Sequence, residues 1–436
     1  MSDYIPVTER EREEMLAAIG VKSVDELFED IPVKLRSDKL KLPEGLSQQE
    51  VYEKLKKTAS LNRVYRSCMR GAGAYRHYIP AVVKAIAARS EFVTAYTPYQ
   101  AEMSQGILGA MFEYQTYICL LTGMDVSNAS LYNGATAAAE AALMTKERGR
   151  YKVFVTDNVR PDVLAVMRTY LTAKGMELNV IPSKDGATDV SALKALLDAS
   201  AAAVYVEQPN YFGLIEDLDA IGEAAHAAGA KFIAGCNPIA LAALKTPAEC
   251  GADIAVGEGQ PLGMSLAFGG PYLGFIACKE KEVRKLPGRI VGETVDRDMR
   301  KAYVLTLQPR EQHIKRERAS SNICSNEALC ALTATVYMGA MGKEGMREAA
   351  SACTSYAHYA ARKFAEAGLE LRYKGEFFHE FVTVAKGASD KILTALDERG
   401  ILGGLKLNDD ELLWCFTELN SKDEIDEAAT LIGGAL

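Results

Sequence analysis

Short apolar runs alternate with helical patterns between residues 67 and 288, and this alternation constrains the fold more than any other feature. The runs of strand length lie at 153–156, 178–181, 203–206, 231–234, 254–256 and 274–277. Because each run is apolar on both faces and follows a helical segment, the pattern predicts a mainly parallel sheet sandwiched by helices. The clearest crossover helices are expected at 162–174 and 217–228, and Gly229 closes the second.

Three parts are predicted along the 436 residues. Residues 1–66 form a helical arm with helices at 8–19 and 47–61, too poor in apolar residues to fold alone. Residues 67–310 form the large α/β domain, and residues 311–436 form a smaller α+β domain. Its expected elements are helices at 326–368 (broken near 339–345), 389–400 and 421–433 and strands at 380–384 and 411–417.

Composition narrows the classes of function. The net charge of −8 argues against binding to the nucleic-acid backbone. The nine cysteines form no Cys-x-x-Cys pair and lie near no histidine pair at zinc spacing, so we expect reduced thiols and no metal. No secretory signal opens the sequence, and no apolar run reaches membrane-spanning length. These features predict a soluble cytoplasmic protein.

A turn of small residues, Ser130-Leu131-Tyr132-Asn133-Gly134-Ala135-Thr136, precedes the expected helix at 137–144. Backbone N–H groups at such a helix start suit a phosphate, which makes Ser130, Asn133, Gly134 and Thr136 candidate ligands. The alternative is a plain helix start with Thr136 as its cap. The pattern alone leaves both interpretations open.

Residues 251–279 read as a strand, a short loop and a Gly-Gly-Pro turn into another strand. In pyridoxal-phosphate enzymes of the aspartate-aminotransferase fold, a segment of this shape carries the Schiff-base lysine. Gln260 stands there instead, and an amide cannot form an imine with an aldehyde. Those enzymes also place an aspartate against the pyridinium nitrogen, where this chain has Ala234. Both losses predict a vestigial cofactor site with no covalent attachment.

Two polar segments are candidate contact sites. The first contains Tyr96, Thr97, Tyr99 and, slightly later, Gln105, where Pro98 favours a rigid loop. Such aromatic loops form contact surfaces or pocket walls, unless the tyrosines pack against their own domain. The second spans 308–317 and includes His313 and Arg316. This segment is either an anion or partner site or a solvated helix face.

The longest distinctive strings are GAGAYRHYIPAVV, TAYTPYQAEMSQG, SLYNGATAAAEA, VEQPNYFGLIED, FGGPYLGFIA and GRIVGETVDRDMRKAYVLTLQPREQHIKRERASSNICSN. With them the chain resembles, over nearly its whole length, the alpha subunits (subunit 1) of the glycine cleavage system P-protein, in its bacterial two-subunit form. This resemblance implies the type I fold of pyridoxal-phosphate-dependent transferases. It also implies a beta subunit that retains the lysine and binds pyridoxal phosphate, and a heterotetramer of both chains.

In that family the complex decarboxylates glycine and passes the aminomethyl group to the lipoyl arm of the H-protein. Because this transfer reduces the lipoyl disulfide, the enzyme is classed as an oxidoreductase. The resemblance therefore implies that this chain has no catalytic residue of its own. It would furnish walls of the partner's active site from Tyr96, Thr97, Tyr99, Gln105, His313 and Arg316. Where relatives tend to have a His-Pro pair, this chain has Arg160-Pro161, so a ring that would stack on the cofactor is absent.

Two alternatives remain at this stage. One is a self-sufficient pyridoxal-phosphate lyase or aminotransferase that uses another lysine, with Lys245 and Lys279 as the nearest candidates. Lys245 is expected on a crossover helix and Lys279 at the far end of a strand. The other alternative is a non-catalytic scaffold of the same fold.

Overall fold

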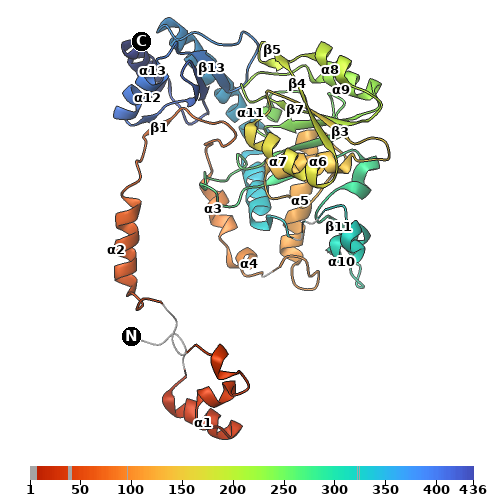
Figure 1. The fold of residues 1–436 in the computed structure, drawn as a ribbon, viewed down its shortest axis with the longest axis vertical. Helices are drawn as coiled ribbons and strands as arrows, with labels where there is room; N and C mark the ends of the chain where they lie inside the picture. The colour runs from red at the N-terminus through yellow and green to blue at the C-terminus, as the bar shows by residue number, and fades with distance from the viewer. Residues whose placement is uncertain (1–6, 38–41, 96, 322, 324) are drawn as a thin grey trace. The chain divides into compact units, whose positions relative to one another are not determined.

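The computed structural model describes residues 7–37, 42–95, 97–321, 323 and 325–436 (Figure 1). The chain divides into two compact units, Met1–Val64 and Tyr65–Leu436. The predicted boundary near residue 310 stays a prediction. Within the described residues, no helix combines the length and the apolar character needed to cross a membrane.

The first unit consists of short helices without a buried core. Helices α1 (Glu9–Ile19) and α2 (Gln48–Ala59) begin where the sequence predicts them. Each starts with a capping box, Thr8 with Glu11 and Ser47 with Glu50, in which side chain and backbone satisfy each other's donors. The 3₁₀ turns η1 (Val24–Phe28) and η2 (Val33–Leu35) lie between them. None of these helical residues is buried.

A seven-stranded sheet forms the centre of the second unit, in the order β2-β10-β9-β8-β7-β3-β4. The strands are β2 (Val126–Ser127), β3 (Lys152–Thr156), β4 (Glu177–Ile181), β7 (Ala201–Gln208), β8 (Lys231–Cys236), β9 (Ile254–Glu258) and β10 (Gly274–Cys278). The pairs from β9 through β4 are parallel, as predicted. Strand β10 differs and runs antiparallel to β9, because the loop between them holds no crossover helix.

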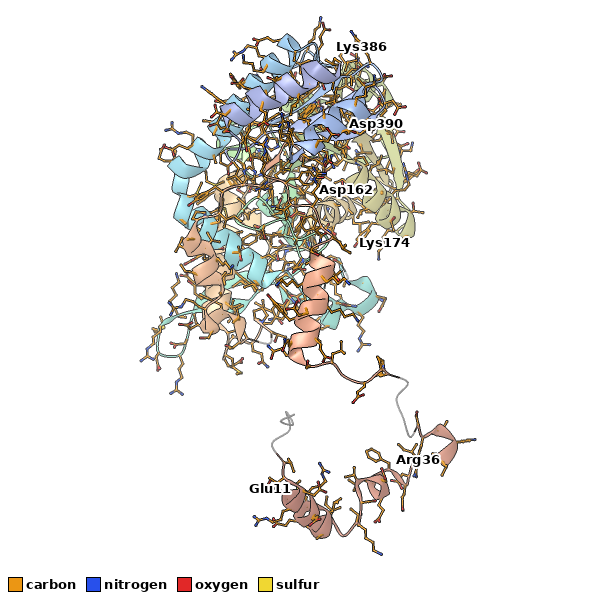
Figure 2. The ribbon with its side chains drawn as sticks, turned by 90° about the vertical axis from the view of Figure 1, so that its left-hand side faces the viewer. Glu11, Arg36, Asp162, Lys174, Lys386 and Asp390 are labelled. Atoms are coloured by element: carbon orange, nitrogen blue, oxygen red, sulfur yellow. The ribbon has the colours of Figure 1, made fainter. Side chains whose placement is uncertain are left out.

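Helices cover both faces of this sheet (Figure 1). Along β3, Val153 and Val155 face α6 (Gly134–Met144) and α7 (Pro161–Ala173), while Phe154 faces the opposite core. That second core includes α5 (Gln105–Thr122), α9 (Leu218–Ala227) and the first half of α11 (Ala328–Glu366). Figure 2 labels Asp162 and Lys174, which mark the two ends of α7. The predicted α/β fold class is therefore present.

Several shorter elements surround this sandwich. They are α3 (Ala81–Ala87), α4 (Ser90–Val93), α8 (Val190–Leu196), α10 (Gln312–Lys315), η3 (Ala240–Ala242), η4 (Glu280–Lys285), η5 (Gln308–Arg310), η6 (Arg316–Arg318) and the hairpins β5 (Ser183–Lys184) with β6 (Ala187–Thr188) and β11 (Val291–Val295) with β12 (Lys301–Leu305).

The C-terminal part packs a small sheet against helices. The strands β13 (Glu380–Val384), β16 (Glu411–Cys415) and β15 (Leu405–Asn408) form the sheet. The helices of this part are α12 (Ser389–Glu398), α13 (Lys422–Ala435) and the second half of α11. Helix α11 is interrupted at Gly342, whose φ of 58° is non-helical, inside the predicted break.

Aromatic side chains fill the core of this part. Phe364 packs edge-on against Trp414 at 4.8 Å between ring centroids, and Phe381 stacks on Phe416 at 5.9 Å. Burial of each ring removes a large apolar area from water and stabilises the fold by roughly 1.5–3 kcal/mol. The short strand β1 (Ser67–Cys68) pairs in parallel with β14 (Ile401–Leu402), which ties the start of the second unit to its end.

Candidate functional site

A small cavity lies beyond the carboxyl ends of β7, β8 and β9, where open α/β sheets bind ligands. Charged and aromatic side chains from distant segments line it, among them Tyr75, Arg160, Glu207, Tyr211, Glu258 and Glu380. Its volume is about 50 Å³. Sites for small molecules and cofactors are generally about 300–1,000 Å³. The cavity is therefore much smaller than a cofactor site.

The first turn of α6 already holds a negative group. Glu258, at the end of β9, accepts hydrogen bonds from the backbone N–H of Gly134 at 2.9 Å, of Gln260 at 2.9 Å and of Leu273 at 3.1 Å. A Cβ atom on Gly134 would lie only 2.9 Å from the backbone nitrogen and the Cβ of Glu258, so glycine permits this close approach. Burial raises the pKa of Glu258, while the three N–H donors lower it.

Asn133 satisfies the next donor of α6. Its side-chain oxygen accepts from the backbone N–H of Thr136 at 2.8 Å and from the Thr136 hydroxyl at 2.7 Å. The helix cap is thus Asn133, not Thr136, which corrects the alternative considered from sequence. Ser130 is fully buried, and its hydroxyl accepts from Asn326 Nδ2 and from the backbone N–H of Glu327. Ser130 therefore anchors the segment that leads into α11.

Gln260 is fully buried, and every polar atom of its side chain bonds to the backbone. Its Oε1 accepts from the N–H of Tyr75 at 2.9 Å. Its Nε2 donates to the carbonyl of Tyr75 at 2.8 Å and to that of Met264 at 2.7 Å. The amide thereby holds the loop that carries Tyr75 against the carboxyl end of β9. This pattern needs a donor and an acceptor in one side chain, which an amide supplies.

Arg160 enters the cavity from the start of α7. Its Nη1 donates to the carbonyl of Gly73 at 3.2 Å, and its Nε lies 3.7 Å from Glu207 Oε1. Glu207 also accepts from the backbone N–H of Arg160 at 2.9 Å. Burial raises the pKa of Glu207, and Arg160 opposes that rise. The guanidinium thus fills cavity space and compensates a buried carboxylate.

A third carboxyl group, the buried Glu380 of β13, closes the cavity from the C-terminal sheet. It accepts from the backbone N–H of Ala72 at 2.6 Å and from the Tyr75 hydroxyl at 2.8 Å. Burial is the largest cause that raises the pKa of Glu380 from 4.5 to about 7. Burial and Glu380 likewise raise the pKa of Tyr75. This pair joins the loop after β1 to the C-terminal sheet.

Ala234 and the two lysines lie away from the cavity wall. Ala234 is fully buried in the core on the α9 side of β8, and the wall is formed by the next residues of that strand and loop. Lys279 follows β10 at the opposite edge of the sheet, where its Nζ donates to the carbonyl of Gly251. Lys245 follows η3 rather than lying on a crossover helix, and its Nζ is 2.7 Å from Asp219.

The predicted aromatic loop is held by its own domain. Tyr96 lies outside the described residues. The hydroxyl of Tyr99 donates to Asn326 Oδ1 at 2.8 Å, and the Arg289 guanidinium lies 4.7 Å from the ring centroid. Thr97 is half-buried and accepts through its carbonyl from Ser104.

Gln105, at the start of α5, is also bound within its own domain. Its amide nitrogen donates to the carbonyl of Ala101, and its amide exchanges two hydrogen bonds with the backbone of Tyr303 in β12. Its polar atoms are therefore used inside the domain.

His313 and Arg316 both lie on the surface around α10. His313 Nδ1 is 3.7 Å from Glu311 Oε2, and Glu311 forms a closer ion pair with Arg289. Arg316 has a φ of 54° and is exposed. Neither residue lines the cavity among the described residues.

The candidate residues predicted from the sequence did not include the carboxyl groups of Glu258 and Glu380. One signal was present for Glu258, which lies two residues before Gln260 in a loop otherwise free of charge. For Glu380, which lies more than 300 positions from its partner Tyr75, the sequence holds no local signal.

The amino-acid sequence of this chain matches a known protein family. A sequence profile described as "Glycine cleavage system P-protein" matches residues 2–432. The chain belongs to the glycine cleavage system P-protein family. This confirms the family that the sequence strings indicate.

Similar proteins match this chain along nearly its full length, in sequence and in structure. The "Probable glycine dehydrogenase (decarboxylating) subunit 1" of Desulfitobacterium hafniense is 49% identical, with 99% of each chain covered. A crystal structure of a P-protein, titled glycine decarboxylase of the glycine cleavage system in inhibitor-bound form, superposes with a TM-score of 0.94 at 42% identity over 100% of both chains. A sphingosine-1-phosphate lyase of Burkholderia pseudomallei shares the fold alone, with a TM-score of 0.68 at 15% identity over 92% of this chain and 93% of the lyase. The predicted type I fold of pyridoxal-phosphate-dependent transferases is confirmed.

Proposed function

We propose that this chain is the alpha subunit of a glycine decarboxylase, binds no pyridoxal phosphate of its own and acts only with a beta subunit. Relatives named subunit 1 of glycine dehydrogenase (decarboxylating) support the family role. The observation that chiefly supports the non-binding role is the position of Glu258, whose carboxylate accepts a hydrogen bond from the Gly134 N–H at the start of α6.

The residues at the cavity do not fit the cofactor of the fold. A phosphate at the first turn of α6 would meet the carboxylate of Glu258, and two anions at one buried position repel each other strongly. No lysine is among the described residues that line the cavity. The side-chain amide of Gln260 is hydrogen-bonded to the backbone of Tyr75 and Met264. The cavity volume of about 50 Å³ is small for a cofactor site.

In this proposal the beta subunit holds pyridoxal phosphate, which supplies the electron sink for loss of CO₂ from glycine. The aminomethyl group then passes to the lipoyl arm of the H-protein. This chain contributes a wall to the partner's site through the segment of Thr97, Tyr99 and Gln105 and through His313 and Arg316. The bonds of Tyr99 to Asn326 and of Gln105 to Tyr303 support a positioning role, because they hold that wall rigid.

Reconstitution tests this function. The chain and its cognate beta subunit are purified separately, and glycine–bicarbonate exchange in the presence of lipoylated H-protein is measured for each alone and for the mixture. We expect exchange from the mixture and none from this chain alone. Full exchange from the beta subunit alone would refute the proposal and favour a non-catalytic scaffold, and exchange from this chain alone would favour a self-sufficient enzyme.

A further inference from the structure

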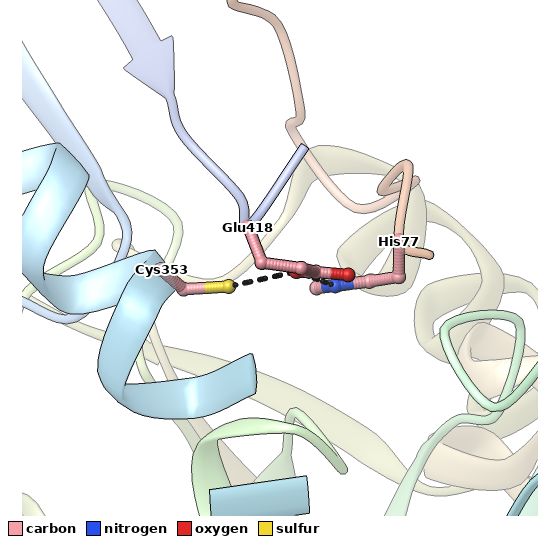
Figure 3. Close-up of side chains that lie close together, drawn as sticks. All are labelled: His77, Cys353 and Glu418. Carbon is pink, nitrogen blue, oxygen red and sulfur yellow. Dashed lines mark hydrogen bonds and ion pairs between the residues drawn. The ribbon is translucent and has the colours of Figure 1, made fainter. Parts of the chain in front are cut away.

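Three residues from separate segments meet in the second unit, away from the small cavity (Figure 3). His77 lies on the loop between β1 and α3, Cys353 on α11, and Glu418 just after β16. His77 Nδ1 is 2.8 Å from Glu418 Oε2, and the Cys353 thiol donates to the same oxygen at 3.3 Å. One ligand atom from each residue lies within 4.8 Å of the others. Local sequence spacing could not show this cluster.

We propose that His77, Cys353 and Glu418 form a binding site for a divalent transition-metal ion of the zinc class. Imidazole nitrogen, thiolate sulfur and carboxylate oxygen are the three ligand types that zinc takes in proteins. A tetrahedral ion with N and O ligands at about 2.0 Å holds those atoms roughly 3.3 Å apart. The present separation of 2.8 Å between His77 Nδ1 and Glu418 Oε2 is about half an ångström shorter than this, and all three ligand atoms lie within 4.8 Å of one another, so the side chains must adjust to seat an ion.

Charge balance favours a divalent ion. The side chains of His77 and Glu418 are 1% and 15% exposed, and Cys353 is fully buried. A thiolate, a carboxylate and a neutral imidazole carry two negative charges, which a divalent cation cancels.

One contact around the cluster suits a metal site. The backbone N–H of Tyr78 donates to Glu418 Oε1 at 2.6 Å, which orients the carboxylate and leaves Oε2 for the ion.

A bound ion would join three segments that otherwise meet through the two hydrogen bonds to Glu418. The loop that carries His77 also carries Tyr75. The backbone N–H of Tyr75 donates to Gln260, and its hydroxyl donates to Glu380. The ion would therefore fix that loop to α11 and to the C-terminal sheet. The site is independent of the proposed cofactor loss, since none of its ligands lines the small cavity among the described residues.

Cobalt substitution tests the site on the full chain. The reduced protein is stripped with a chelator and titrated with Co²⁺, and the near-ultraviolet thiolate-to-cobalt charge-transfer band is recorded. We expect a band that saturates at one equivalent and that Zn²⁺ abolishes. Cys353→Ala should lose the band, whereas Cys278→Ala, equally buried in β10, should keep it.

The conservative variant Glu418→Gln guards against misfolding of the cysteine variant. It should fold, keep the Tyr78 contact and bind Co²⁺ at least about 10-fold more weakly, by analogy with the loss seen on disturbing groups around metal ligands. Absence of a band in the unmodified chain would overturn the proposal. A band of unchanged intensity and affinity in Cys353→Ala and Glu418→Gln would also overturn it, because it would show adventitious binding to other thiols.

Discussion

The carboxylate of Glu258 lies at the first turn of α6, 2.9 Å from the backbone nitrogen of Gly134. In a fold whose relatives include pyridoxal-phosphate enzymes, this helix start is the natural place for an anion. The chain fills it from within, because β9 ends on a glutamate and Gly134 leaves room for that side chain. Gln260 and Arg160 are likewise hydrogen-bonded within the chain near this end of the sheet.

Removal of this internal anion should create a phosphate site. In Glu258→Ala the N–H groups of Gly134 and Leu273 lose their acceptor, which should lower the free energy of unfolding by at least about 2 kcal/mol. Inorganic phosphate should then raise the melting temperature of the variant and leave that of the unmodified chain unchanged. Thermal melts with and without phosphate measure this, with the exposed Glu223→Ala as control. An equal rise in all three proteins would contradict the account.

Gln260 should prove to be a structural residue. Gln260→Ala removes the acceptor for the N–H of Tyr75 and the donor to Tyr75 and Met264, so we expect a loss of about 2–4 kcal/mol in denaturant unfolding. The exposed Gln312→Ala should change stability by less than about 0.5 kcal/mol. If both variants unfold at the same denaturant concentration as the unmodified chain, Gln260 does not clamp the loop.

Arg160 and Glu207 should be energetically coupled. Arg160→Met leaves the buried carboxylate of Glu207 without its cation, which should cost about 3 kcal/mol. Glu207→Gln in the same chain removes that charge, so the double variant should be more stable than Arg160→Met alone. A double-mutant cycle in urea measures the coupling. Additive losses would show that the guanidinium does not compensate this charge.

Glu380 should make stability depend on pH. Its pKa is raised from 4.5 to about 7 in the folded chain, so its contribution is complete below pH 4.5 and is lost as pH rises to about 7. The shift corresponds to about 3 kcal/mol at most. The melting temperature of the unmodified chain should therefore fall relative to Glu380→Gln over this range and level off above it. The variant Glu376→Gln, at an exposed position, should melt with the same pH dependence as the unmodified chain. If the melting temperatures of Glu380→Gln and of the unmodified chain follow parallel curves against pH, the pKa of Glu380 is not raised.

The sequence predicted the sheet well because its signal is local. The apolar runs of β3, β7 and β8 are buried on both faces, and the capping boxes of α1 and α2 lie within four residues. The break of α11 at Gly342 was also visible in the clustered glycines. The direction of β10 was not, since it depends on whether the loop after β9 folds into a helix.

The site was predictable only in part. Gln260 was identified by position, and the candidate helix start was found at Gly134, but the bond that joins them through Glu258 depends on tertiary packing. The family resemblance predicts Gln105 and Tyr99 as partner contacts. Their engagement with Tyr303 and Asn326 arises from segments about 200 residues away, which no local pattern reveals.

Equilibrium binding of pyridoxal phosphate to the purified chain tests the central claim most directly. The chain is dialysed against the cofactor, treated with borohydride to fix any imine, and analysed by visible absorption and mass spectrometry. We expect no stoichiometric cofactor and no modified lysine, because Glu258, Gln260 and Arg160 occupy the site. One equivalent of cofactor per chain, fixed to a lysine, would contradict this account.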